Sequence, residues 1–385
     1  MIIRIIRYFV RKTVWGLCCL IPVCKNKIVV SSFYGKGYGG NPKYIVEQLL
    51  RENKKYKIIW LIHEEKYSES LPEGVQPCLK KSFKCIYHMA TAKIWIDNCR
   101  KSVKYKRKSQ YYIQTWHGFA LKRIEKDVED KLGADYVRAA KKDSKAIDLI
   151  ISEGKHMTEI YKNAFWYNGK IVEWGSPRYD VIINKEKSEK SLSKVMDYYD
   201  IKNKKIILYA PTFRNNNDMS PYQLDFEAVI KACEAKFKCE FMMCLRLHPN
   251  ISNKSKEFKF DCKNIVDATL YPDVQELLCA ASIVISDYSS LMFDFALSYK
   301  PCFQFATDIE EYKKDRNFYF DLEKLPFDLA KSNEELINKI NNFNHEKYSE
   351  ELSQYFDDVG MIREGNSSEK CVELIEKIVS GKYKC

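Results

Sequence analysis

Short apolar runs alternate with amphipathic stretches through the first half of the chain. The apolar runs predict strands at 27–31, 58–62, 94–97, 112–116, 149–152 and 171–174. Apolar residues recur with helical spacing at 41–51 and 155–164, which predicts helices there. Strands that alternate with helices are typical of parallel sheets whose strands are joined by crossover helices.

A polar, lysine-rich stretch at 184–205 separates this series from a second one and is interpreted as a linker with a helix at 191–199. The second series has predicted strands at 206–209, 241–247, 283–286 and 302–305, and predicted helices at 226–235, 273–280, 289–298 and 333–340. A last helix at 368–379 is expected to cross back and clasp the two domains. The sequence therefore predicts an α/β protein with two doubly wound, Rossmann-like domains that face each other across a cleft, which suits a chain of 385 residues. The expected divisions are an N-terminal segment at 1–24, a first domain at 25–200 and a second domain at 201–385.

One histidine follows a predicted buried strand in each half of the chain. His117 comes after the strand at 112–116, and His248 comes at the end of the strand at 241–247. Ligands of parallel α/β proteins bind at the carboxyl ends of the strands, and histidine is the side chain best suited to move a proton near neutral pH. The two histidines therefore indicate a catalytic cleft, although a hydrogen-bonded structural histidine is the alternative for each.

The neighbours of the two histidines predict different roles. Gly118 allows the backbone beside His117 to approach a ligand closely, and the charges of Lys122 and Arg123 disfavour an imidazolium, so His117 is the expected base. His248 lies beside Arg246 and is better placed to contact a phosphate.

Other polar residues at strand ends are typical of anion sites. Asp287 follows the strand at 283–286, and Ser289 and Ser290 begin the next predicted helix, where free backbone N–H groups attract anions. An ordinary helix cap explains the same residues equally well. Asp294, early in that helix, either faces the ligand or favours the helix dipole.

Two further strand ends carry arginine. Pro211 fixes the turn after the strand at 206–209, and Thr212 and Arg214 point polar groups at the mouth of the predicted cleft. Arg178 follows the strand at 171–174, and arginine is the side chain best fitted to clamp a phosphate. A single arginine in a turn is more often simply solvated. The strand ends that carry His, Arg, Thr and Ser together indicate a site more strongly than any one of them does.

Charge and composition narrow the class of partner. The formal charge is +12, from 64 Lys and Arg against 52 Asp and Glu, which favours a phosphorylated substrate, a nucleic acid or an acidic lipid. The aromatic residues lie in apolar segments rather than along a basic stripe, which argues against nucleic acid. The 14 cysteines include no C-x-x-C pair and fit a reducing compartment.

The N-terminal segment has the composition of an interfacial anchor. Arg4, Arg7, Arg11 and Lys12 are interleaved with Ile and Phe, and the uncharged run that follows is too short to span a bilayer. A helix packed on the protein's own core is the alternative. No D-x-D, P-loop or G-x-G-x-x-G pattern occurs, and neither a metal nor a cofactor is expected.

Five segments together resemble one family. They are, in order, Q-T-W-H-G-x-x-L-K, S-P-R-Y-D, Y-A-P-T-F-R, L-R-L-H-P and S-D-Y-S-S-x-x-F-D. The ordered set is similar to the CDP-glycerol glycerophosphotransferase family, whose members build teichoic acids and related capsules in Gram-positive bacteria. The resemblance implies a GT-B-like fold, work at the cytoplasmic face of the membrane, a CDP-glycerol or related CDP-polyol donor and a lipid-linked acceptor.

The resemblance also implies roles for the residues in these motifs. His117 matches the family's catalytic histidine and His248 its second essential histidine. Residues that match the family's substrate-contacting positions, or lie beside them in the same motifs, are Gly118, Leu121, Lys122, Arg178, Pro211, Thr212, Arg214, Arg246, Asp287, Ser289, Ser290 and Asp294. The chain departs from the family at Phe119-Ala120, where Thr-Pro is common, and this places the usual acceptor or polyol in question.

The expected reaction is transfer of glycerol phosphate from CDP-glycerol to a hydroxyl of a lipid-linked acceptor, with release of CMP. Ribitol or another polyol stays open, as does the choice between a primase and a polymerase. A glycosyltransferase of the same fold, which would release UDP or GDP from a nucleotide-sugar, is the alternative from another class because fold alone does not decide function.

Overall fold

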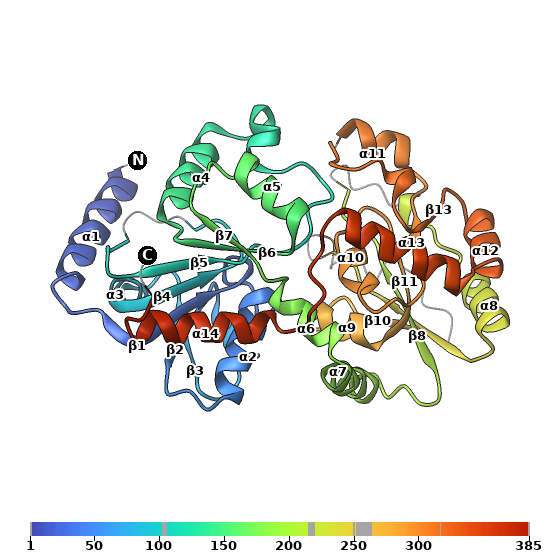
Figure 1. Cartoon of the computed structure of the whole chain (residues 1–385), viewed down its shortest axis with the longest axis horizontal. Helices are drawn as coiled ribbons and strands as arrows, with labels where there is room; N and C mark the ends of the chain where they lie inside the picture. The colour runs from blue at the N-terminus through green and yellow to red at the C-terminus, as the bar shows by residue number, and fades with distance from the viewer. Residues whose placement is uncertain are drawn as a thin grey trace. The chain divides into compact units, whose positions relative to one another are not determined.

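The computed structural model describes residues 2–101, 106–214, 220–248, 251, 264–315 and 317–383. It divides into two compact units (Figure 1). Unit 1 comprises residues 1–117, 125–180 and 366–385, and unit 2 comprises 118–124 and 181–365. Residues 181–200, which the sequence analysis placed in the first domain, belong to unit 2, because helix α7 (Lys185–Tyr198) packs against α9 (Val274–Ala280).

A parallel sheet forms the centre of unit 1. Its strand order within the described residues is β3-β2-β1-β4-β5-β6-β7, so the order reverses between β1 and β4. This reversal is the topological switch point at which open α/β sheets bind ligands. The strands are β1 (Cys24–Ser31), β2 (Lys57–Ile62), β3 (Val75–Leu79), β4 (Ala92–Asp97), β5 (Tyr111–Gln114), β6 (Leu149–Ser152) and β7 (Lys170–Glu173).

Burial on both faces explains why the central strands are easy to recognise in the sequence. Ile28, Val29 and Val30 of β1 are all fully buried, as expected for a parallel sheet that is covered by helices on both sides. Strand β3 was missed because it contains Pro77, and proline is confined to edge strands such as this one.

The helices of unit 1 come from both ends of the chain. The C-terminal helix α14 lies beside α2, and Cys371, Val372 and Ile375 of α14 are buried in the same core as the strands (Figure 1). The last helix thus crosses back to unit 1, and residues 366–385 belong to unit 1 although the expected division placed them in the second domain. The helices are α1 (Ile2–Cys18), α2 (Gly40–Arg51), α3 (Phe83–Thr91), α4 (Ala134–Ala146), α5 (Lys155–Ala164) and α14 (Ser367–Val379).

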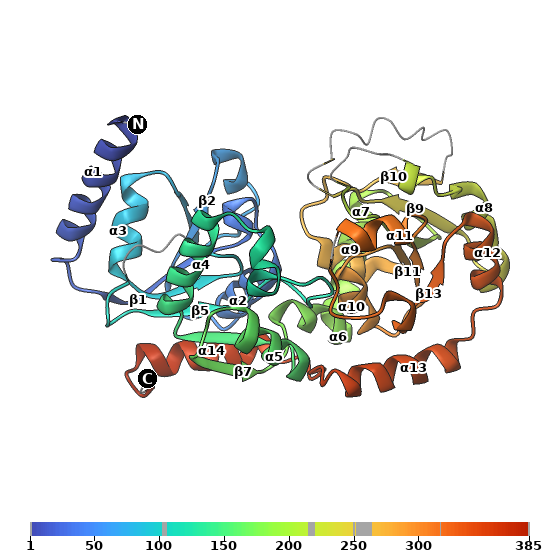
Figure 2. The ribbon, with the colours of Figure 1, turned by 90° about the horizontal axis from the view of Figure 1, so that it is seen from above.

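A buried carboxylate fixes the start of α14. The two side-chain oxygens of Asp180 accept hydrogen bonds from the backbone N–H groups of Ser367 and Ser368, at 3.0 and 2.7 Å. These N–H groups have no partner inside the helix, and an acidic side chain at a helix N-terminus also complements the helix dipole. Asp180 therefore anchors the chain where it re-enters unit 1 after helix α13 (His345–Asp358), a path that Figure 2 shows.

Unit 2 repeats the same plan. The strand order in its described part is β10-β9-β8-β11-β12-β13, with the reversal between β8 and β11. Strands β10 and β13 were missed because each has three residues and lies at an edge of the sheet. The strands are β8 (Lys205–Ala210), β9 (Phe241–Leu245), β10 (Ile265–Asp267), β11 (Ala281–Ser286), β12 (Cys302–Phe305) and β13 (Asp328–Ala330). The helices besides α7, α9 and α13 are α6 (Asp180–Ile183), which starts at the end of unit 1, α8 (Phe226–Phe237), α10 (Leu291–Ala296), α11 (Ile309–Asp315) and α12 (Asn333–Asn341).

Three elements near the candidate residues end earlier than the sequence pattern predicts. Strand β5 ends at Gln114 rather than at residue 116, and β9 ends at Leu245 rather than at 247. Helix α10 is shorter than the predicted 289–298. Trp116 shows the reason for β5, because its φ of 48° takes the backbone out of the extended conformation that a strand requires.

The N-terminal segment forms a helix that packs on α3. Trp15 of α1 contacts Trp95 edge to face with ring centroids 6.4 Å apart, and Arg11 donates a hydrogen bond to the carbonyl of Lys81 at 3.1 Å. The packing leaves Phe9 57% and Leu17 60% exposed. Across the described residues, no helix has both the length and the apolar character needed to cross a membrane.

Candidate functional site

Three strand ends meet beside the switch point of unit 1. Ser32 follows β1, Asn98 follows β4 and His117 follows β5. The side chain of Asn98 accepts a hydrogen bond from the Phe33 N–H at 2.8 Å and donates one to the Ser32 hydroxyl at 3.0 Å. Its backbone carbonyl lies 2.6 Å from Nδ1 of His117. The first predicted catalytic histidine is therefore held at the position where this fold binds ligands.

The contact with Asn98 fixes which nitrogen of His117 carries the proton. A carbonyl oxygen can only accept a hydrogen bond, so Nδ1 of the neutral imidazole is the protonated nitrogen. Nε2 then keeps its lone pair and is available as a proton acceptor. An imidazole oriented in this way has the geometry that general-base catalysis requires.

The surroundings of His117 keep it neutral. Burial lowers the pKa of His117 to about 4, the hydrogen bond to Asn98 acts in the opposite direction, and the charge of Arg178 lowers the pKa further. The sequence analysis attributed this effect to Lys122 and Arg123. The cation that acts on His117 is Arg178 instead, and burial contributes more than any charge.

Arg178 is hydrogen-bonded to the backbone of the loop that follows β5 and carries His117. Its Nη1 donates to the carbonyl of His117 at 2.6 Å, and its backbone N–H donates to Oδ1 of Asn41 at 3.1 Å. The amide nitrogen of Asn41 donates in turn to the carbonyls of Thr115 and Trp116, at 2.9 and 3.2 Å. The predicted residues His117 and Arg178 are thus brought together by Asn41.

Asn41 and Asn98 were not predicted as parts of the site. Asn41 lies in the glycine-rich segment after β1, at the start of α2, for which the sequence predicts a helix at 41–51, and its side chain is fully buried. Gly40, in that segment, has a φ of 61°, and a Cβ atom there would lie 2.8 Å from the amide nitrogen of Asn98. The glycine at position 40 was the one sequence signal for this packing, because a larger residue would not fit so close to Asn98.

The switch point of unit 2 carries a second group of polar residues. Pro211 is buried directly after β8, and the N–H of the next residue, Thr212, donates to the carboxylate of Asp287 at 2.9 Å. Asp287 follows β11 and also accepts from the N–H of Tyr288 at 2.6 Å. Asp287 therefore joins the two strand ends on either side of the switch point.

Arg214 supports this group from the inside. Nε and Nη2 donate to the carboxylate of Asp308 at 2.6 and 2.9 Å. Nη2 also lies 2.9 Å from the carboxylate of Asp287. Nη1 donates to the carbonyl and the hydroxyl of Thr212 at 2.7 and 2.8 Å. These five contacts use the five N–H groups of the guanidinium. The geometry therefore fits a support for the loop after β8 better than a direct contact with phosphate.

The positive charge of Lys122 acts on His248 within unit 2. Partial burial lowers the pKa of His248, and the charges of Lys122 and Arg246 lower it further. The amine of Lys122 donates to the hydroxyl of Tyr312 at 2.7 Å, and the Tyr312 ring centroid lies 4.7 Å from the guanidinium carbon of Arg214. Lys122 and His248 thus influence each other electrostatically, and Lys122 is linked through Tyr312 to the loop after β8.

The remaining predicted residues of unit 2 have mostly local contacts. Arg246 donates to the carbonyls of Ala268 and Tyr271, at 3.1 and 2.8 Å, and Asp294 accepts from Gln275 at 2.8 Å. Both side chains are thus hydrogen-bonded within unit 2. Ser289 and Ser290 are partly buried and precede α10.

The segment between the two parts of unit 1 is fixed by aromatic packing in unit 2. Phe119 contacts Phe293 and Phe320, with ring centroids 4.5 and 5.6 Å apart, and the carbonyl of Leu121 accepts from the N–H of Tyr319 at 3.0 Å. Gly118, with a φ of 143°, begins this segment. Phe119, the residue at which the chain departs from the family pattern, is therefore part of a hydrophobic cluster.

No cluster of His, Cys, Asp or Glu with the spacing of a metal site occurs in the part of the chain that the structure describes.

Two parallel sheets, each with polar residues gathered at its switch point, define a GT-B-like α/β protein. A structure of the wall teichoic acid polymerase TagF superimposes on 99% of this chain and 97% of its own, with a TM-score of 0.85 and 28% sequence identity. A TagF variant soaked with CDPG superimposes with a TM-score of 0.84 and 28% identity, covering 97% of this chain and 95% of that one. The chain belongs to the CDP-Glycerol:Poly(glycerophosphate) glycerophosphotransferase family, whose pattern matches residues 16–377.

Relatives in this family act on different polyols. The chain is 33% identical to a teichoic acid poly(glycerol phosphate) polymerase of Bacillus spizizenii over 94% of both proteins. It is 32% identical to the corresponding polymerase of Bacillus subtilis, over 95% of this chain but about half the length (50%) of that protein. It is also 26% identical to a teichoic acid poly(ribitol-phosphate) polymerase of Bacillus spizizenii, over 92% of this chain and 57% of that one. The chain thus belongs to the family of teichoic acid polyol-phosphate transferases, whose members include both glycerol-phosphate and ribitol-phosphate polymerases.

Proposed function

We propose that this protein transfers glycerol phosphate from CDP-glycerol to a hydroxyl of a lipid-linked acceptor and releases CMP. The observation that carries the proposal is the contact between Nδ1 of His117 and the carbonyl of Asn98, which leaves Nε2 as a neutral base. The family membership and the greater identity to a glycerol-phosphate polymerase than to a ribitol-phosphate polymerase support glycerol as the polyol.

In the proposed reaction, Nε2 of His117 takes the proton of the acceptor hydroxyl as its oxygen attacks the phosphorus that carries glycerol. A new P–O bond forms to the acceptor, and the P–O bond to the bridging oxygen breaks, so that CMP leaves with the electron pair. Positive charge that is fixed before the reaction stabilises the leaving phosphate.

We assign stabilisation of this charge to Lys122, with neutral His248 as a hydrogen-bond donor to the phosphate. We assign binding of CDP-glycerol to Pro211, Thr212, Ser289 and Ser290. Burial keeps His117 neutral, and Arg178 lowers its pKa further and donates a hydrogen bond to its backbone carbonyl. Arg214, Arg246, Asp287 and Asp294 shape the surrounding loops through the contacts described above. A metal is not part of this proposal, because the positive charge that it needs comes from a side chain of the protein.

The exposed apolar surface of α1 and α3 supports action at a membrane. Phe9 and Leu17 of α1 and Phe83 of α3 are more than half exposed, and Lys12 lies on α1 near them in the sequence. Apolar side chains beside lysine and arginine are the composition with which interfacial helices bind acidic lipid. We therefore place the protein at the cytoplasmic face of the cell membrane as a peripheral protein.

A CMP release assay tests the function directly. Purified protein is incubated with CDP-glycerol or CDP-ribitol and with lipid-linked acceptor in vesicles of acidic or neutral phospholipid. We expect CMP from CDP-glycerol, and more of it with acidic vesicles. CMP from CDP-ribitol alone would show that the polyol is ribitol and not glycerol. Equal rates in the two kinds of vesicle would contradict the membrane proposal. Release of UDP or GDP from a nucleotide-sugar would show that the protein is a glycosyltransferase instead.

The pH dependence of the rate should report His117. The base acts when neutral, and its pKa of about 4 keeps it neutral throughout the physiological range. We therefore expect kcat/KM for CDP-glycerol to stay constant from neutral pH down to about pH 5 and to fall only below that. An ordinary histidine would lose activity as the pH fell through about 6.5.

Arg178→Gln is the matched variant for this pH profile. Removal of the cation raises the pKa of His117, because Arg178 is one of the groups that lower it. The acid limb of the profile should therefore move to higher pH. A wild-type limb near pH 6.5, or a limb that moves to lower pH in the variant, would contradict the role given to His117.

A further inference from the structure

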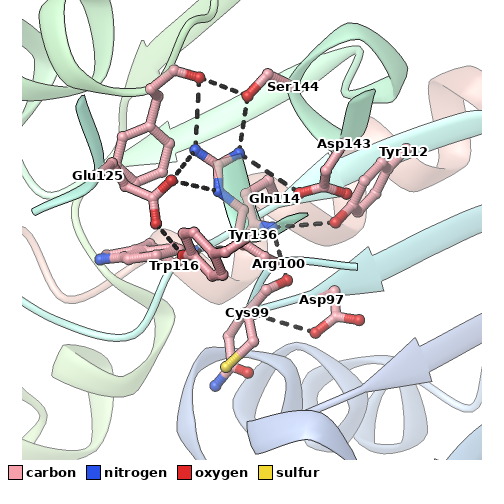
Figure 3. A network of polar contacts seen from close by, with 12 residues as sticks. Asp97, Cys99, Arg100, Tyr112, Gln114, Trp116, Glu125, Tyr136, Asp143 and Ser144 are labelled. Atoms are coloured by element: carbon pink, nitrogen blue, oxygen red, sulfur yellow. Dashed lines mark hydrogen bonds and ion pairs between the residues drawn. The ribbon is translucent and has the colours of Figure 1, made fainter. Parts of the chain in front are cut away.

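A buried cluster of charged residues lies beside the loop that holds His117, and the reaction proposed above does not use it. Its members are Arg100, Glu125 and Asp143, which are 7%, 5% and 0% exposed (Figure 3). Arg100 follows β4, Glu125 precedes α4 and Asp143 lies within α4. Three segments of unit 1 thus converge on one guanidinium.

Arg100 is hydrogen-bonded in several directions. Nε and Nη2 donate to Oε2 of Glu125 at 3.0 and 2.8 Å, and Nη1 donates to the hydroxyl of Ser144 at 2.8 Å and to Asp143 at 3.5 Å. The carbonyl of Phe165 accepts from Nη2 at 3.4 Å, and the guanidinium carbon lies 4.4 Å from the centroid of the Phe165 ring. These contacts leave the side chain, and with it the backbone of the loop after β4, little freedom to move.

The same loop supplies the acceptor that orients His117. Asn98, whose carbonyl bonds to Nδ1 of His117, is two residues from Arg100. Between them, the carbonyl of Cys99 accepts a hydrogen bond from Nε2 of Gln114 at 3.1 Å (Figure 3). Oε1 of Gln114 accepts from the N–H of Trp116 at 2.9 Å. Arg100 is thus connected to His117 through Asn98 and through Gln114 and Trp116.

Glu125 connects the cluster to the segment that follows His117 in the sequence. Residues 118–124 belong to unit 2, and Glu125 is the first residue of unit 1 after them. Its φ of 56° is unusual for a residue other than glycine. Tyr136 donates to the carboxylate oxygen that Arg100 does not use. The ion pair therefore fixes the chain on the far side of the segment that starts next to His117.

The composition of the cluster favours a role in positioning over one in stability. One guanidinium serves two buried carboxylates, and burial raises the pKa of Asp143 to about 7 although Arg100 acts to lower it. Buried ion pairs contribute little net stability compared with apolar residues of similar volume, and in some proteins they fix a single arrangement of the groups around them. The group that needs a fixed arrangement here is the imidazole of His117.

We propose that Arg100 is a positioning residue for His117. Its guanidinium, held by Glu125 and Ser144, fixes the loop after β4 so that the Asn98 carbonyl accepts from Nδ1 of His117 and Nε2 stays free. The proposal rests on the proposed function of His117 as the base. It assigns to Arg100 no contact with substrate.

The test combines kinetics with ¹⁵N NMR of the imidazole in the full-length protein. Arg100→Lys keeps the charge but loses the planar fork, so it should lower kcat while KM for CDP-glycerol stays the same. The triple variant Arg100→Met, Glu125→Gln, Asp143→Asn carries no charge in the cluster and should lower kcat by about 10²-fold, as expected when a catalytic group is misplaced by about 1 Å. Arg138→Met, which removes an exposed arginine from α4 that pairs with Asp135, is the matched control and should leave kcat and KM unchanged.

The NMR spectra separate positioning from a general loss of structure. The wild-type protein should show a protonated Nδ1 and an unprotonated Nε2 in His117, and both Arg100 variants should show a mixture of tautomers. A wild-type Nε2–H tautomer overturns the proposal without any variant. Folded variants that keep the wild-type kcat, or that lose kcat while His117 keeps the wild-type tautomer, overturn it as well. If His117→Gln retains turnover, the proposal that His117 is the base is refuted. A change of tautomer in the Arg100 variants would still show that Arg100 positions the imidazole.

Discussion

His117→Gln should lower kcat for CMP release by about 10²- to 10⁴-fold, which is the contribution that a general base makes. Glutamine is similar in size and its amide can occupy the position of the imidazole, but it cannot accept a proton near neutral pH. The variant should still bind CDP-glycerol with a dissociation constant within about twofold of wild type, because the donor contacts are assigned to unit 2. Stopped assays of CMP and calorimetric titration with CDP-glycerol measure the two quantities.

His88→Gln is the matched control for this prediction. Burial lowers the pKa of His88 to about 4, as it does for His117, but His88 lies within α3 and not at the end of a strand. Its replacement should leave kcat within about twofold, since surface and helix substitutions away from the site act on stability rather than on chemistry. Near-normal turnover in His117→Gln, or an equal loss in His88→Gln, would refute the role of His117.

The central strands could be predicted from sequence because burial on both faces produces apolar runs. The edge strands could not. Strand β3 is interrupted by Pro77, and β10 and β13 are too short to show a period. The positions of His117 and of Thr212 at strand ends followed from the same runs, since the carboxyl ends of parallel strands lie along one edge of the sheet.

The residues that orient His117 were harder to predict because their signal is not periodic. Asn98, Arg100 and Asn41 act through contacts with residues distant in sequence, and polar residues in loops are by default solvated. Arg100 lies in such a loop, yet it is buried and paired with Glu125. The left-handed backbone at Trp116, which turns His117 away from the strand, leaves no trace in composition.

Arg214→Met should lower the free energy of unfolding of the protein by about 3–5 kcal/mol, the cost of removing one partner from a buried ion pair. Arg214 is 6% exposed and Asp287 is 3% exposed. Although burial acts to lower it, the pKa of Arg214 is raised by its contacts with Asp308 and Asp287, so the side chain stays charged. Without the guanidinium, the carboxylates of Asp287 and Asp308 lose the N–H groups that donate to them. Denaturation by urea, followed by circular dichroism, measures the change.

The donor site should weaken together with the fold in this variant, because Arg214 holds the carbonyl and hydroxyl of Thr212. Arg363→Met is the matched control in the same unit. Its partner Asp357 is largely exposed, and such pairs contribute about 0.2–1 kcal/mol. Combining Arg214→Met with Asp308→Asn should cost less than the sum of the two single changes, because the second removes a carboxylate that the first leaves unpaired. Full additivity, or a loss in Arg214→Met no larger than in Arg363→Met, would show that the network does not support the loop after β8.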